Sequence, residues 1–159
     1  MLAVAGLTSA GSVRADDSAT VRRAFQAIAA RMVRADTSGD ADLYRKVYQA
    51  VYAPGFTFTL PDGKTLTREQ YLETRLHELP QSKGSQEGFK ILRVMQKGNR
   101  ATVDGLVTYR IVQAAPAAEP GAKGAAHVVS GHNTFRSHLV KAGGVWQALN
   151  VTILSVQPN

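Results

Sequence analysis

The sequence contains no cysteine. This absence excludes disulfide bonds, thiolate nucleophiles, and zinc or iron–sulfur centres that are held by cysteine. Long apolar runs are also missing, and no segment reaches the roughly 18 residues that a membrane-spanning helix requires. We therefore expect no membrane span and no cysteine-ligated metal, and nothing in the sequence indicates a cofactor.

Clustered positive charge is scarce as well. The chain has 19 Lys and Arg against 12 Asp and Glu, but the basic residues are scattered, and their densest groups are pairs such as Arg22-Arg23. Because a nucleic-acid-binding face usually needs clustered cations, we expect no nucleic-acid partner. Apolar residues make up 44% of the 159 residues, which is enough for one buried core, so we expect a single compact domain.

The N-terminal segment resembles the end of a secretory signal. A short apolar stretch is followed by small residues, and Val13 and Ala15 occupy the positions that suit a signal peptidase. Arg14 between them is unusual, and a basic start is missing. We interpret residues 1–17 as a signal-peptide remnant or a disordered extension, with the domain in residues 18–159, and we expect a periplasmic or secreted location.

Helical spacing of apolar residues predicts three helices. The first runs from about Ser18 to Asp36, and the second carries Leu43, Val47 and Val51 and ends before Pro54-Gly55. The third begins at Thr67, whose pairing with Gln70 fits a capping box, and ends at Pro80. These are the expected helices.

The remaining chain alternates like strands. Phe56 to Leu60 and Lys64 to Leu66 form a hairpin around Pro61-Asp62-Gly63. Ala114 to Ala125 is rich in Ala, Gly and Pro, so we expect a flexible hairpin loop without chemistry. The predicted order of elements is ααββαββββ, an α+β fold. Four later strands complete it: about Gly88 to Gln96, Ala101 to Gln113, Ala126 to Val140 and Val145 to Val156.

Several of these motifs together resemble the SnoaL-like branch of the nuclear transport factor 2-like superfamily. They are the helix pair, the strings Tyr52 to Phe58 and Pro61 to Lys64, the segment Thr67 to Leu72, and the final strand opened by Gly144-Val145-Trp146. The resemblance covers about residues 19–156. It implies a cone-shaped, strongly curved, mostly antiparallel sheet wrapped around N-terminal helices, an apolar cavity, and often a homodimer. It does not imply one activity, because the superfamily includes isomerases, cyclases, dehydratases and non-catalytic domains.

Acid–base candidates are few. Asp104 is the acid of the strand Ala101 to Gln113, but it lies on the more polar face, where we expect it to pair with Arg110 or water. His132 and His138 share a strand face about 20 Å apart at about 3.3 Å per residue, and His127 lies on the other face, so we predict no metal site. Asp104 and His132 remain weak catalytic candidates.

The last strand differs in sequence from the last strand of other members of the SnoaL-like branch. Members commonly carry histidines on the face of the last-strand Trp, whereas here the face of Trp146 reads Ala148, Asn150 and Thr152. Asn and Thr do not transfer protons near neutral pH, which favours binding over catalysis. A two-residue turn at Ala142-Gly143 would pair Leu139 with Trp146 and place Asn133, Phe135 and Ser137 beside Asn150; a three-residue turn would bring Arg136 and His138 there instead. We favour the first.

Amphipathic rings are the expected wall of the pocket. The residues predicted to bind a ligand are Tyr48, Tyr52, Tyr109, Asn133, Trp146 and Asn150. The favoured function is the binding of a hydrophobic small molecule in a secreted or periplasmic protein. An isomerase, cyclase or dehydratase that acts on a hydrophobic metabolite, and a non-catalytic dimerisation or assembly domain, are the alternatives, so whether the chain is an enzyme stays open.

Overall fold

The computed structural model describes residues 15–82, 84–114 and 126–159. Residues 1–14 of the predicted signal segment and residues 115–125 of the predicted loop lie outside this part of the chain. Helix α1 (Ala15–Ser38) begins three residues before the predicted domain boundary at Ser18.

Helices α2 (Ala41–Val51) and α3 (Arg68–Ser82) follow the predicted pattern. The Asp40 carboxylate accepts hydrogen bonds from the backbone N–H groups of Asp42 and Leu43 and so caps α2. The predicted capping box is present, because the Gln70 N–H donates to the Thr67 hydroxyl and the Thr67 N–H donates to the Gln70 side chain. The predicted end of α3 at Pro80 is wrong by two residues: in the last turn, a proline removes one backbone donor without stopping the helix.

Six strands in the described residues form one mixed sheet in the order β2-β1-β6-β5-β4-β3. Neighbouring strands are antiparallel except β1 and β6, which are parallel. The predicted order of helices and strands and the α+β class are confirmed. The strands are β1 (Tyr52–Thr59), β2 (Thr65–Thr67), β3 (Gln86–Lys97), β4 (Arg100–Ala114), β5 (Ala126–Ala142) and β6 (Val145–Pro158).

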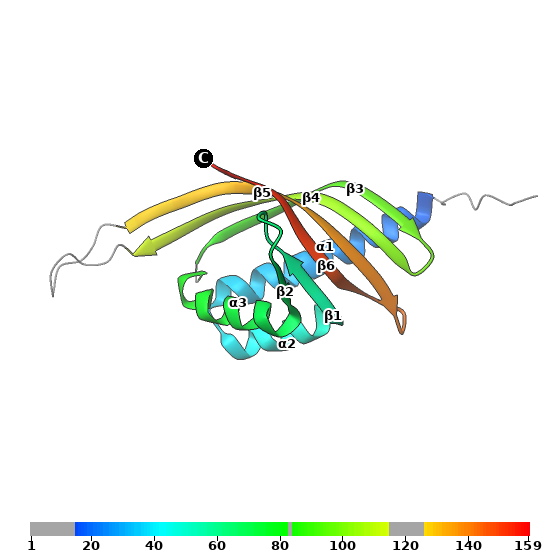
Figure 1. The fold of residues 1–159 in the computed structure, drawn as a ribbon, viewed down its shortest axis with the longest axis horizontal. Helices are drawn as coiled ribbons and strands as arrows, with labels where there is room; N and C mark the ends of the chain where they lie inside the picture. Colours follow the sequence, from blue (N-terminus) through cyan, green and yellow to red (C-terminus); the bar gives the residue numbers. More distant parts are fainter. Residues whose placement is uncertain (1–14, 83, 115–125) are drawn as a thin grey trace, which may run out of the picture.

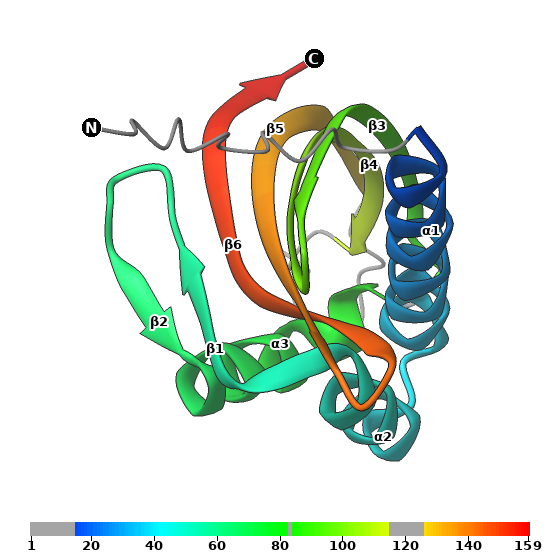
Figure 2. The same cartoon turned by 90° about the vertical axis from the view of Figure 1, so that its right-hand side faces the viewer.

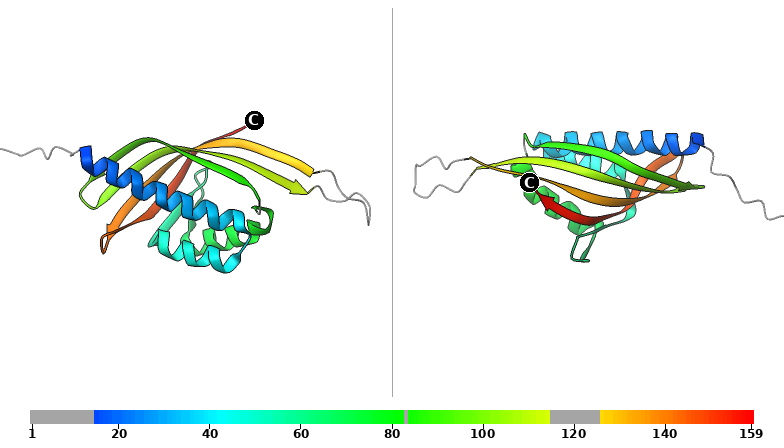
Figure 3. Two further views of the ribbon diagram at one scale, coloured as in Figure 1. Left: turned by 180° about the vertical axis from the view of Figure 1, so that it is seen from behind. Right: turned by 90° about the horizontal axis from the view of Figure 1, so that it is seen from above.

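The sheet is strongly bent, and all three helices lie on its concave side (Figures 1 and 2). Helix α1 runs along β3, while α2 and α3 lie below the sheet, as the views from behind and above show (Figure 3). Within the described residues, three β-bulges that each leave one leucine unpaired accompany the bend: Leu92 in β3, and Leu149 and Leu154 in β6. The pairing of β1 with β6 is also irregular, between Tyr52 and Thr57. Bulges increase local twist and bend a strand, so they help the sheet to curl around the helices.

The hairpin of β5 and β6 turns at Gly143-Gly144, where both glycines have positive φ angles of 56° and 81°. The predicted turn at Ala142-Gly143 is therefore wrong by one residue: Trp146 lies opposite Lys141, and Leu139 lies opposite Ala148. The bulge at Leu149 then reverses the alternation of β6, so that Asn150 pairs with His138.

The core lies between the concave face and the helices. Tyr44 and Tyr48 of α2, Leu79 of α3, and Val103 and Leu139 of the sheet are almost completely buried. In the part of the chain that the structure describes, no helix has the length and hydropathy needed to cross a membrane.

Candidate functional site

A cavity of about 350 Å³ lies between the concave face of the sheet and the three helices. An engineered cavity of about 150 Å³ is enough to bind benzene, and ligand pockets start at about 300 Å³. The space therefore suits a molecule of about two fused rings. Its lining comprises Phe25, Ile28, Ala29, Met32, Asp36, Tyr44, Tyr52, Phe58, Tyr71, Arg75, Ser82, Glu87, Phe89, Val107, Tyr109, Ile111, Asn133, Phe135, Ser137, Ala148, Val151 and Ile153.

Most of this wall is apolar or aromatic. The Phe58 and Tyr71 rings stack with their centroids 4.3 Å apart, and the Phe25 and Phe135 rings stack at 5.6 Å. The Phe135 ring packs against Gly105, where a Cβ atom would come within 2.5 Å of it. The glycine thus makes room for one wall of the cavity.

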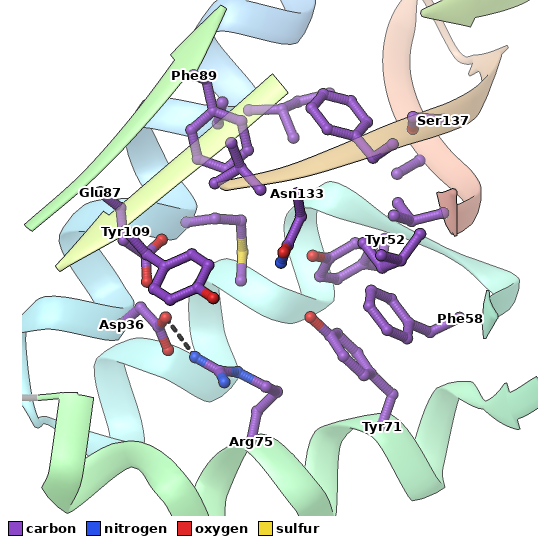
Figure 4. Close-up of a pocket in the computed structure, with 18 of the residues that line it drawn as sticks. Asp36, Tyr52, Phe58, Tyr71, Arg75, Glu87, Phe89, Tyr109, Asn133 and Ser137 are labelled. Atoms are coloured by element: carbon purple, nitrogen blue, oxygen red, sulfur yellow. Dashed lines mark hydrogen bonds and ion pairs between the residues drawn. The ribbon is translucent and has the colours of Figure 1, made fainter. Parts of the chain in front are cut away.

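Charged side chains gather at one end of the cavity (Figure 4). Asp36 comes from the last turns of α1, Arg75 from α3 and Glu87 from the start of β3. Arg75 forms an ion pair with Asp36, and its other terminal nitrogen lies 2.6 Å from the carboxylate of the more exposed Glu78. We call Asp36, Arg75 and Glu87 the charged end.

The carboxyl groups of the charged end affect one another. Asp36 is only 6% exposed, and its Oδ1 atom has no hydrogen-bond partner in the protein. Burial raises the pKa of Glu87, and the neighbouring Asp36 carboxylate raises it further through repulsion and a hydrogen bond, to about 7. Glu87 therefore keeps its proton at a higher pH than an exposed glutamate does.

Polar groups also face the middle of the cavity. The hydroxyls of Tyr52 and Tyr71 point into it next to Asn133 (Figure 4). Burial raises the pKa of Tyr71 to about 12, so the hydroxyl stays protonated and can donate a hydrogen bond. Asn133 Oδ1 and the hydroxyl of Ser137 are buried without a protein partner. Such unpaired groups are costly in an apolar site unless a bound molecule or water satisfies them.

Three of the predicted binding residues line the cavity: Tyr52, Tyr109 and Asn133. The other three lie elsewhere. Tyr48 is buried but does not line the cavity, and its hydroxyl donates to the Arg68 carbonyl at 2.6 Å. Trp146 is buried in the core with the Lys141 ammonium group above its ring.

Asn150 leaves the expected face because of the bulge at Leu149. Its amide nitrogen donates to the Thr57 hydroxyl at 2.9 Å, and its side-chain oxygen accepts from Thr152. Val151 and Ile153 take the cavity positions instead. The preferred inward orientation of Asn133, Phe135 and Ser137, by contrast, agrees with the lining of the cavity.

The weak catalytic candidates lie on the convex face, away from the cavity. Asp104 accepts two hydrogen bonds from Arg136 at 2.7 and 3.0 Å, not from the predicted partner Arg110, and this hydrogen bonding lowers its pKa. His132 lies opposite Thr108 and Gln157 on the same face. In the described residues, no cluster of His, Asp or Glu is arranged to hold a metal ion.

The charged end is not among the site residues predicted from the sequence, although the apolar pattern contains a signal for it. Asp36 lies four residues after Met32 on the apolar stripe of α1, and Arg75 lies three residues after Leu72. Glu87 alternates with Phe89 on the apolar face of β3. In each element, a charged residue occupies a position that the apolar period assigns to the interior.

Comparison with known proteins places this geometry in a fold family. No protein-family model matches the chain, and no curated protein matches it. Solved structures do match. A protein from Salmonella enterica described as nuclear transport factor 2-like has 16% identity and a TM-score of 0.60 over 89% of this chain and 94% of its own. The chain has the nuclear transport factor 2-like fold.

Two further structures share this fold. A conserved protein from Planctomyces limnophilus matches with 15% identity and a TM-score of 0.67 over 89% of this chain and 99% of its own. A type 2 hexachlorocyclohexane dehydrochlorinase matches with 12% identity and a TM-score of 0.66 over 92% of this chain and 93% of its own. At these identities the likeness shows the nuclear transport factor 2-like fold alone.

Proposed function

We propose that this nuclear transport factor 2-like domain binds a small, mostly apolar molecule in its cavity, with a polar group of the ligand at the charged end. The observation that carries the proposal is a cavity of about 350 Å³, lined by aromatic rings, with buried polar atoms that lack protein partners. A ligand would bury apolar surface against the rings and satisfy Asp36 Oδ1, Asn133 or Ser137.

A neutral fluorescent probe, N-phenyl-1-naphthylamine, tests this proposal. Its emission should rise on binding to the wild-type protein, and saturating probe should raise the melting temperature. Val107→Phe places a larger side chain on a lining position of β4 and should weaken binding at least tenfold. Leu106→Phe, one residue away on the opposite face, is the matched control and should bind normally. Equal binding by both variants would place the probe outside the cavity.

A second candidate function is proton transfer, as in an isomerase, cyclase or dehydratase that acts on a hydrophobic metabolite. The specific observation in its favour is that Glu87 faces the cavity with a pKa of about 7, where a carboxyl group can both accept and donate a proton. A dehydrochlorinase and a ketosteroid isomerase-like protein from Erwinia carotovora share the fold, which makes such chemistry compatible with it.

Hydrogen–deuterium exchange at carbon tests the second candidate. In D₂O, a bound two-ring ketone such as 2-tetralone would lose an α-proton to the Glu87 carboxylate while the electron pair moves to the carbonyl oxygen, and a deuteron would return. NMR should show exchange faster than in buffer for the wild-type protein and for the control Glu73→Gln, which changes an exposed residue of α3. Exchange that persists in Glu87→Gln would exclude this role.

Location and assembly remain proposals. The resemblance of residues 1–17 to a signal remnant supports export to the periplasm or secretion, and the family resemblance to the SnoaL-like branch supports a homodimer. Fractionation of cells that express the native gene would test the first, and sedimentation equilibrium would test the second. A stable dimer that binds no ligand would favour the assembly function.

A further inference from the structure

The charged end contains more groups that can carry a negative charge than groups that carry a positive charge. Among the described residues that line the cavity, the charged ones are Asp36, Glu87 and Arg75. The guanidinium is already divided between Asp36 and Glu78. No ion pair joins Glu87 to a cation within the described residues. The cavity therefore contains two carboxyl groups and no free cation for the second.

Asp36 also lacks a hydrogen-bond donor for one of its two carboxylate oxygens. It is more than nine-tenths buried, it lines the cavity, and its Oδ1 atom has no hydrogen-bond donor in the protein while Glu87 is ionised. Burial of an unpaired acceptor is costly, so this atom requires a donor from the cavity. A proton on Glu87 is one such donor, and a group of a bound ligand is another.

We propose that the cavity selects a small apolar amine in its protonated form, with the ammonium group between Asp36 and Glu87 and the apolar body against the aromatic wall. This inference deepens the proposed binding function and rests on it. It names the chemical class of the ligand, which neither the fold nor the related structures specify.

Three properties of an ammonium group match this site. It has three hydrogen-bond donors and no acceptor, which suits the Asp36 Oδ1 atom and the Glu87 carboxylate. Its positive charge balances the second carboxylate, and the electron-rich faces of the lining rings attract cations. An anionic ligand would meet two carboxylates beside a guanidinium that is already paired, and an alcohol has only one donor.

Binding of an ammonium should be coupled to the proton of Glu87, because both occupy the same place. The groups that face Glu87 are Asp36 from α1, Tyr71 and Arg75 from α3, and Tyr109 opposite it on β4. The exposed Arg34 lies in the outer groove between α1 and β3. Asp36 keeps the Glu87 proton in place at low pH, and a cation displaces it at higher pH. Affinity for the amine should therefore increase as the pH rises through about 7.

Three compounds of one shape separate the possibilities: 1-naphthylmethylamine, the neutral 1-naphthylmethanol and the anionic 1-naphthoate. Isothermal titration calorimetry at pH 8 should show the amine binding at least about tenfold more tightly than the alcohol, and the naphthoate binding most weakly. From pH 8 to pH 6 the affinity for the amine should fall about tenfold, while that for the alcohol stays constant. Titrations in two buffers of different ionisation enthalpy should show that the amine releases protons when it binds at pH 7 and that the alcohol does not.

The variant Glu87→Gln should bind the amine and the alcohol equally at both pH values, and the control Glu73→Gln should behave like the wild type. Equal affinity of the wild-type protein for amine and alcohol at pH 8, or no proton release, would overturn the amine inference and leave the binding function intact. Failure of all three compounds and of the neutral probe to bind would overturn the binding function as well. If Glu87→Gln does not fold, the amine inference is tested by the proton release that calorimetry measures for the wild-type protein.

Discussion

Two ion pairs of the same kind lie in different surroundings on the two sides of the sheet. On the concave side, Asp36 of α1 and Arg75 of α3 meet beside Glu87 in a cavity, and on the convex face of the sheet Asp104 meets Arg136 near solvent. Inside, the pair leaves one oxygen of Asp36 unsatisfied, and burial together with the Asp36 carboxylate raises the pKa of the neighbouring Glu87. Outside, the hydrogen bonds from Arg136 satisfy Asp104 and lower its pKa. Residue type alone therefore does not mark the site, because burial decides what a carboxylate does.

The largest effect is expected for a buried ring of the concave face. Trp146 is 7% exposed, whereas its neighbour Val145, which points the other way, is 58% exposed. Trp146→Ala should lower the free energy of unfolding by about 3 to 5 kcal/mol, measured by urea denaturation, because it removes apolar contacts and leaves a void. Val145→Ala is the control and should change it little. Similar losses for the two variants would mean that the hairpin does not separate the faces as described.

The inner ion pair should matter more than the outer one. Arg75→Met removes the cation of the buried Asp36 and should lower the free energy of unfolding by about 3 kcal/mol. Part of this loss should be recovered in the double variant with Asp36→Asn, which no longer buries an unpaired charge. Arg136→Met on the exposed face should have a small effect. If Arg136→Met lowered the free energy of unfolding more than Arg75→Met did, the outer ion pair would be the more important one and this prediction would be wrong.

The raised pKa of Glu87 predicts that the free energy of unfolding depends on pH near neutrality. Its pKa is raised from 4.5 to about 7 in the folded protein, so between these values the folded state binds more protons than the unfolded state. The free energy of unfolding should therefore decrease as the pH rises from about 5 to 8, by on the order of 2 kcal/mol. Glu87→Gln should remove this slope in denaturation measured across the same pH range, and Glu73→Gln should retain it.

The smallest effect is expected for Asp104, the acidic residue of β4 that the sequence offered as a catalytic candidate. Asp104→Asn weakens an ion pair at the surface, where such pairs contribute little to stability. Because hydrogen bonding to Arg136 lowers the pKa of Asp104, the small contribution is present near neutral pH and is lost in acid. The melting temperature should shift by no more than about 2 °C at pH 7, and probe binding should be unchanged. Loss of probe binding would restore Asp104 as a site residue.

The sequence predicted the fold better than the site. Period and turn chemistry are local, so the capping box at Thr67 and the apolar face of β4 from Val103 to Ile111 could be recognised directly. The bulge at Leu149 is not local, because it depends on how β6 meets two neighbouring strands, and it removed Asn150 from the expected face. The charged end joins Asp36, Arg75 and Glu87 from three elements, and a single sequence does not show that those elements meet.

The three leucine bulges affect the curvature of the strands without changing which side chains line the cavity. In most binding sites a change in shape also changes the lining. A bulge accommodates one extra residue while the strand on either side keeps its partners, so Ala148 and Val151 both face the cavity although an odd number of positions separates them. Deletion of Leu149 would therefore leave the same side chains facing inward on a flatter strand. Deletion of a bulge leucine is therefore expected to change the width of the cavity while the residues that line it stay the same.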